Sequence, residues 1–138
     1  MSVTYRIYRE LGLVYVRYEG FVEFDATSDA VGRYIQDPDY RPGQKQFVDL
    51  SAATGYENDY AKLFALQAKK ADAFLKGLQC LIVYYAPTET SNTIARLAAR
   101  AWDETASVIA RVIDNEAEAL AVVGLSETSI EELTKRPV

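Results

Sequence analysis

The sequence predicts a single α/β domain, a sandwich in which helices pack on a mixed sheet of about five strands. Three observations lead to this fold class. The first two predicted elements are both strands, after which strands and amphipathic helices alternate along the chain. The apolar stretch "LQCLIVYYAP" at 78–87 is nearly continuous, which is typical of a central strand covered on both faces. The 138 residues are enough for one domain with a substantial core and too few for two ordinary domains.

The first half of the chain begins with a predicted hairpin. Residues 3–9 and 13–18 alternate between the two faces of a strand, and the intervening "ELG" supplies the turn. Apolar side chains then recur at near-helical spacing over 24–35, until Pro38 stops the pattern. A short apolar strand, "QFVDL" at 46–50, follows and is expected to lead into a polar loop.

The second half continues this alternation. Residues 59–76 place apolar side chains, among them Tyr60 and Phe64, at three- and four-residue steps, which predicts an amphipathic helix. After the strand predicted within "LQCLIVYYAP", which Pro87 ends, three further helix starts are indicated by residues that commonly cap helices: Thr88, Asn115 and Ser129. A short strand within "SVIARVID" lies between the first two of these helices.

Charge and composition exclude several kinds of chemistry. The formal charge of −5 works against nonspecific nucleic-acid binding, so no nucleic-acid partner is predicted. The absence of histidine excludes Ser-His-Asp and Cys-His nucleophilic systems and most transition-metal sites, so no metal or cofactor is predicted. Cys80, the one cysteine, is expected to be buried and inert. Without a signal peptide or the roughly 20 apolar residues that span a bilayer, the protein is predicted to be cytoplasmic, with no transmembrane segment.

A polar segment after the third predicted strand is the first candidate site. Its members are Asp49, Ser51, Glu57 and Asp59. Asp49, at the carboxyl end of a strand, lies where α/β sheets commonly bind ligands, although an aspartate there also accepts bonds from local backbone N–H groups. Asp59 or Asn58 is expected to cap the following helix, and the sharper hypothesis is that Asp59 and Glu57 dock a basic partner. Oxygen ligands for Mg²⁺ and paired carboxylates for acid–base catalysis remain alternatives.

Aromatic and basic side chains near the fourth predicted strand form the second candidate site. Tyr84 and Tyr85 are adjacent at its end, so one is expected on each side of the sheet, and Trp102 lies in the next helix. These aromatic residues either line a pocket for an apolar ligand or fill the core. Arg96 and Arg100 lie one helical turn apart, where they either grip a phosphate or carboxylate or form a solvated face.

The element order, with "VDLS" at the end of the third strand, "YYAP" at the end of the fourth and "DNEAEAL" opening a late helix, resembles the SpoIIAA-like or STAS superfamily of small bacterial proteins. The resemblance assigns residues 1–125 to the domain and 126–138 to a C-terminal tail with a short helix. It implies a noncatalytic regulatory domain that binds a protein partner. In anti-sigma-factor antagonists of that superfamily a D-S-S-G motif carries a phosphorylated serine. Asp59 stands where this serine would be, so the phosphorylation switch cannot be carried over.

We therefore expect a protein-binding or regulatory domain and not an enzyme. The alternative is a carrier or sensor of a small apolar or anionic, lipid-like ligand held between the sheet and the helices near Tyr84, Tyr85 and Trp102. A hydrolase or isomerase comes last, because the sequence indicates no nucleophile or oxyanion hole. A homodimer is also predicted, from the aromatic residues of the helices: Phe24, Tyr60, Phe64 and Phe74.

Overall fold

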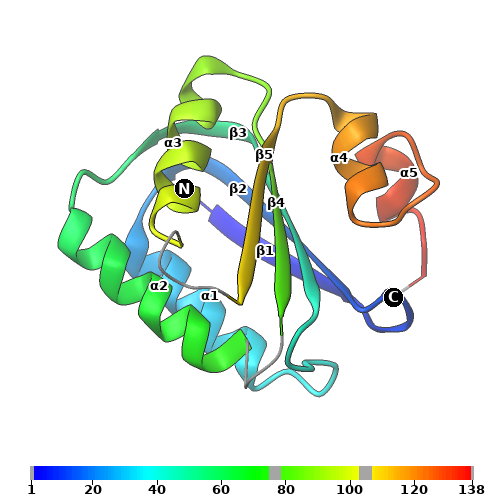
Figure 1. Ribbon diagram of the computed structural model, residues 1–138, viewed down its shortest axis with the longest axis horizontal. Helices are drawn as coiled ribbons and strands as arrows, with labels where there is room; N and C mark the ends of the chain where they lie inside the picture. The colour runs from blue at the N-terminus through cyan, green and yellow to red at the C-terminus, as the bar shows by residue number, and fades with distance from the viewer. Residues whose placement is uncertain (1, 75–78, 103–106, 138) are drawn as a thin grey trace.

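A computed structural model describes residues 2–74, 79–102 and 107–137 and confirms the α/β fold (Figure 1). The described strands form one mixed sheet in the order β1-β2-β3-β4-β5. The strands are β1 (Ser2–Tyr8), β2 (Leu13–Val22), β3 (Lys45–Tyr56), β4 (Cys80–Tyr85) and β5 (Val108–Ile113). The helices are α1 (Phe24–Ile35), α2 (Tyr60–Phe74), α3 (Glu89–Arg100), α4 (Glu116–Val122) and α5 (Ile130–Thr134), with a 3-10 turn at Arg9–Leu11.

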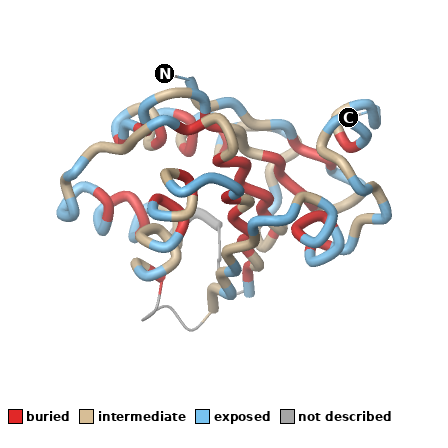
Figure 2. The backbone as a smooth tube through the Cα atoms, turned by 90° about the horizontal axis from the view of Figure 1, so that it is seen from above, coloured by how far each residue is buried: buried red, intermediate tan, exposed pale blue. Residues whose placement is uncertain are grey.

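The sheet separates two layers of helices. Helices α1, α2 and α3 cover one face, and the shorter α4 and α5 cover the other (Figure 1). Successive residues of a strand point to opposite faces, so Val14 and Tyr84 join the core under α1 to α3, while Leu13 and Val83 join the core under α4 and α5. Figure 2 shows the buried residues concentrated along the central strands.

The predicted hairpin at the start of the chain is confirmed. β1 pairs antiparallel with β2, from Ser2 opposite Glu19 to Tyr8 opposite Leu13. Gly12 closes the turn at φ 58°, a left-handed conformation that glycine adopts at little cost. The other three strand pairs are parallel, as expected when helices connect successive strands.

The third strand is longer than the sequence predicted. The chain does not enter a loop after Leu50 but stays in β3 as far as Tyr56. The extension pairs with the second half of β2, where Glu19 lies opposite Ala52 and Val22 opposite Tyr56. The prediction of a polar loop over residues 51–56 was therefore wrong, because "SAATG" has few of the β-branched and aromatic residues that mark strands and is held in the sheet by its partner strand.

The predicted helix caps are confirmed where the structure describes them. Thr88 and Ser91 form a reciprocal capping box at the start of α3. The side chains of Asn115 and Ser129 accept backbone N–H bonds at the starts of α4 and α5. In the segment after residue 125, α5 packs on the sheet, and the Tyr8 hydroxyl donates to the Leu133 carbonyl at 3.2 Å.

Over the described residues, no helix has both the length and the apolar character needed to cross a bilayer.

Candidate functional site

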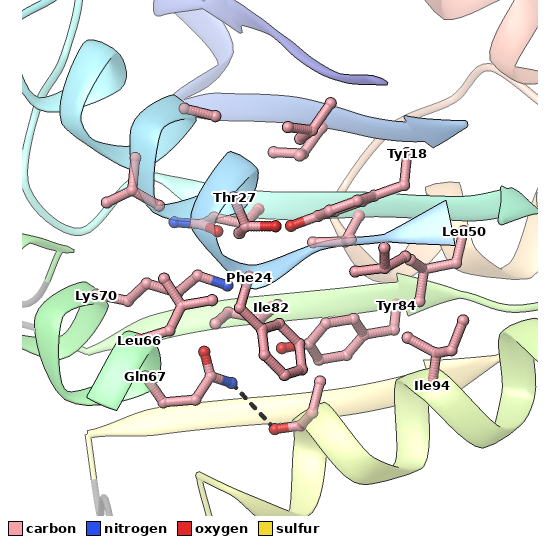
Figure 3. Close-up of a pocket in the computed structure, with 18 of the residues that line it drawn as sticks. Tyr18, Phe24, Thr27, Leu50, Leu66, Gln67, Lys70, Ile82, Tyr84 and Ile94 are labelled. Atoms are coloured by element: carbon pink, nitrogen blue, oxygen red, sulfur yellow. Dashed lines mark hydrogen bonds between the residues drawn. The ribbon is translucent and has the colours of Figure 1, made fainter. Parts of the chain in front are cut away.

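A cavity lies between the sheet and the three larger helices. α2 packs mainly on α1 and stands off the sheet, so the side chains between them leave an open space of about 80 Å³ (Figure 3). The wall is mostly apolar. Its side chains from the sheet include Val16, Tyr18, Val48, Leu50, Ile82 and Tyr84.

One face of α2 forms the outer wall of this cavity. Its cavity-lining residues are Leu63, Leu66, Gln67 and Lys70. These positions are three, four and seven residues apart, so they share one side of a helix. Tyr60 and Phe64, which the spacing placed among the apolar residues of this helix, are instead 52% and 59% exposed. The predicted homodimer through such residues stays a prediction, and the side chain of Phe74 lies outside the described residues.

Lys70 is the one charged residue among the described residues that line the cavity. It is half-buried, and Figure 3 shows its amine directed into the space between α2 and the sheet. Within the described part of the chain, no hydrogen bond or ion pair involves this amine. Burial lowers the pKa of the Lys70 ammonium to about 8. The cavity therefore offers a proton-bearing group that lacks a counter-ion.

Gln67 adds a polar group beside Lys70. Its Nε2 donates to the Ala98 carbonyl of α3 at 3.2 Å, which joins α2 to α3 across the end of the cavity (Figure 3). Its Oε1 is buried and has no hydrogen-bond partner among the described residues. A buried acceptor without a donor is costly, so this oxygen would gain from a donor brought in by a ligand or by water.

Four tyrosines from the sheet line the cavity: Tyr5, Tyr18, Tyr56 and Tyr84. Tyr84 is 4% exposed, and its hydroxyl accepts a bond from Trp102 Nε1 at 3.0 Å. Burial raises the pKa of both Tyr84 and Tyr18, so both hydroxyls are protonated at neutral pH. The rings of Tyr18 and Tyr84 give the cavity wall apolar surface, and their hydroxyl groups add polar atoms to it.

Arginines surround a separate hollow on the other side of α3. The hollow has a volume of about 420 Å³ and is bounded by α3, Trp102 and β5. Arg96 and Arg100, which their spacing places on one face of the helix, line it from α3, and Arg111 joins them from β5. Trp102 borders this hollow and also bonds to Tyr84, so it lies between the hollow and the cavity.

Asp49 lies on the opposite face of the sheet from the cavity. It is fully buried in the interior of β3 and not at a strand end, so that prediction was wrong. Its Oδ2 accepts bonds from the Tyr15 hydroxyl at 2.6 Å and from Arg17 at 2.9 Å. Its Oδ1 accepts from the backbone N–H and the hydroxyl of Ser51, at 3.0 and 2.6 Å. Both carboxylate oxygens thus accept hydrogen bonds from groups of the protein, which indicates a structural role for Asp49.

The acidic residues before α2 act at the start of that helix. Asp59 Oδ1 accepts the Lys62 backbone N–H at 3.1 Å, which confirms the predicted cap. Glu57 lies 3.6 Å from the Lys62 amine. Among the described residues, no group of three or more acidic or cysteine side chains is placed to hold a metal ion.

Replacing Asp59 with alanine is expected to destabilise the protein by about 1 kcal/mol, because an N–H at the start of α2 loses its acceptor. Urea unfolding followed by circular dichroism measures this change. Asn58→Ala is the matched control and should change stability by less than about 0.5 kcal/mol, since such surface substitutions are usually mild. A larger loss for Asn58 than for Asp59 would show that the cap has been assigned to the wrong residue.

The structure thus divides the predicted site residues among three places. Tyr84, Arg96, Arg100 and Trp102 lie around the cavity and the arginine hollow. Asp49, Ser51 and Tyr85 lie on the other face, where the Tyr85 ring centroid is 6.2 Å from that of Phe47. Glu57 and Asp59 lie at the start of α2. The prediction that the two adjacent tyrosines face opposite sides of the sheet is confirmed.

Three residues of these sites were missed by sequence reasoning: Gln67, Lys70 and Arg111. Gln67 and Lys70 continue the three- and four-residue spacing of Leu63 and Leu66. Polar residues on the same helix face as a row of apolar residues could have indicated that these two side chains are buried. Arg111 is the single polar residue of the strand sequence "VIARVI", and one charged residue in an otherwise apolar strand gives no signal of a site.

In comparisons with known proteins, the sequence matches no protein-family model and no curated protein.

Proposed function

We propose that this domain is a noncatalytic carrier or sensor that binds a small apolar anion in the cavity, with the anionic end at Lys70. The observation that supports this function is the unpaired Lys70 amine, the one charged group among the described residues of a mostly apolar enclosure. An anion beside the amine would favour its protonated form and offset the cost of burial, and the carbon skeleton of the ligand would cover the apolar wall.

The cavity limits the size and the chemistry of the ligand. Its volume of about 80 Å³ is roughly half that of an engineered cavity of about 150 Å³ that binds benzene. A short monocarboxylate suits this space, whereas isovalerate, which has one heavy atom more than benzene, would enter with a small outward movement of α2. A longer tail would enter only by displacing α2, the wall that packs least on the sheet. The unpartnered Oε1 of Gln67 would accept a bond from a ligand hydroxyl or from a water that enters with the ligand.

The same lining supports binding without catalysis. In the cavity wall, burial raises the pKa of the Tyr18 and Tyr84 hydroxyl groups, so neither can act as a general base at neutral pH. The Asp49 carboxylate is on the other face of the sheet and is held by Tyr15, Arg17 and Ser51. The resemblance to the SpoIIAA-like or STAS superfamily stays a prediction, and this binding role does not depend on it.

Calorimetric titration of the protein with isovalerate should detect binding that depends on Lys70. Lys70→Met is expected to weaken the affinity about tenfold or more, because the carboxylate loses its charge partner. The affinity should be constant at pH values below 8 at which the ligand carboxyl group, with a pKa of about 5, remains ionised. It should fall as the pH rises above 8, since the Lys70 pKa of about 8 sets the loss of the proton. Butyrate and octanoate extend the series and test whether chain length is limited by the cavity.

Lys69→Met is the matched control. The Lys69 amine bonds the Ser28 hydroxyl at 2.8 Å on the surface, so this substitution removes the same charge without touching the cavity. Equal affinities for wild type and Lys70→Met would contradict the proposal. Equal binding of isovalerate and of the neutral alcohol of the same shape would show an apolar site with no preference for anions.

A further inference from the structure

The outer edge of β5 is an open sheet edge among the described strands. The carbonyls of Ser107 and Ile113 accept bonds from the β4 side, from the N–H groups of Cys80 and Ala86, at 2.9 Å each. Parallel strands use alternate residues for pairing, so the odd-numbered residues of β5 face β4. The backbone N–H and C=O groups of Val108, Ala110 and Val112 therefore point away from the sheet. Such an edge can pair with an added strand.

Positive charge lies beside this edge. Arg96 and Arg100 line the adjoining hollow from α3, and Arg111 lies in β5 itself. Among the described residues that line the hollow there is no acidic side chain, although the whole chain has a formal charge of −5. Arg96 Nε bonds Asn92 at 2.7 Å, and Arg100 has no partner among the described residues. Each of these guanidinium groups therefore keeps N–H donors for an external anion.

Arg111 connects the charge with the strand edge. Its Nη1 donates to the carbonyl of Ala110 at 3.0 Å, and that carbonyl is one of the groups that point outward. The side chain thus occupies an acceptor that an added strand would use. A partner carboxylate that attracts Arg111 would free the Ala110 carbonyl for pairing with a backbone N–H.

We propose that β5 binds an acidic, extended segment of a partner protein, which adds a strand to the sheet edge and places its carboxylates against Arg96, Arg100 and Arg111. Strand addition supplies affinity through the backbone, and the charged side chains select the partner. A second copy of this chain fits less well, because pairing β5 with β5 would bring two sets of arginines together. This binding surface is independent of the ligand cavity and would operate whether or not the cavity is filled.

The test uses the ¹⁵N-labelled full chain and a peptide of about nine residues that alternates glutamate and threonine, long enough to span the six residues of β5. The expected affinity is weak, on the order of a millimolar dissociation constant. The amide signals of Val108, Ala110 and Val112 should shift. The same peptide with lysine in place of glutamate should cause no such shifts.

Two variants separate the charge contribution from the backbone contribution. The double variant Arg100→Glu with Arg111→Glu should weaken binding of the acidic peptide about tenfold or more. Lys135→Glu changes a lysine that is 73% exposed on α5 and serves as a charge control. Ala110→Pro removes an outward N–H at a position where an edge strand tolerates proline, so it should abolish binding while the other amide signals keep their positions.

Several results would overturn the proposal. Unchanged binding in the double variant or in Ala110→Pro would exclude strand addition at β5. Shifts at the same amides with pyrophosphate, and none with the acidic peptide, would show a site for small anions. A wild-type dimer that Ala110→Pro converts to a monomer in sedimentation velocity would assign the edge to a second copy of the chain.

Discussion

Replacing Lys70 with methionine is expected to stabilise the folded protein by about 2 kcal/mol at pH 7. The wild-type amine has a pKa of about 8 in the folded protein against 10.5 in the unfolded chain. The unfolded chain therefore binds the proton more tightly, and the protonated lysine destabilises the fold at every pH below about 8. Methionine has a similar length and no charge, so it removes this cost and keeps the apolar contacts of the stem.

The pH dependence of this effect has a definite sign. As the pH rises from 8 toward 10.5, the folded protein loses the Lys70 proton first, and wild-type stability rises toward that of the variant. Urea unfolding at pH 7 and pH 9.5 measures the difference. Lys69→Met should show no comparable change between the two pH values. If Lys70→Met were less stable than wild type at pH 7, an unseen partner of the amine would have to exist and the binding proposal would lose its basis.

Replacing Asp49 with alanine is expected to destabilise the protein by about 3 kcal/mol, the cost of breaking a buried, charged hydrogen-bond network. The Tyr15 hydroxyl and the Ser51 N–H would both lose a buried acceptor, and Arg17 would lose its buried ion-pair partner. Isovalerate binding by the folded fraction should be unchanged, because Asp49 and the cavity lie on opposite faces of the sheet.

Glu19→Ala is the control for this second prediction. Glu19 is the other partner of Arg17, at 2.9 Å, but its side chain is 58% exposed. Its removal should change stability by less than about 1 kcal/mol, as is usual for surface pairs. If Asp49→Ala were as stable as wild type but did not bind isovalerate, Asp49 would have a role in ligand binding and not in stability.

Local chemistry in the sequence predicted the helix starts and most strands. Thr88, Asn115, Ser129 and Asp59 cap helices through bonds that span only three residues, so the necessary information is contained in a short stretch. The extension of β3 to Tyr56 is different, because it depends on pairing with a strand more than 30 residues earlier in the chain.

The candidate sites depend even more on tertiary packing. α2 carries apolar residues on more than one side, and only the position of α1 and the sheet decides that Leu63 and Lys70 face inward while Phe64 faces outward. The arginine hollow forms because β5 lies beside α3, which brings Arg111 next to Arg96 and Arg100. The four-residue spacing within α3 predicted that Arg96 and Arg100 share a face. Spacing within one helix says nothing about a residue such as Arg111, which comes from a strand elsewhere in the chain.

The hydrogen bond between Trp102 and Tyr84 also gives the protein a built-in optical reporter. Trp102 is the only tryptophan in the chain and is 3% exposed. Its indole N–H bonds a hydroxyl on the cavity wall, while its ring borders the arginine hollow. Indole fluorescence depends on local polarity and hydrogen bonding, so unlabelled wild-type protein carries a single indole that borders both proposed binding surfaces.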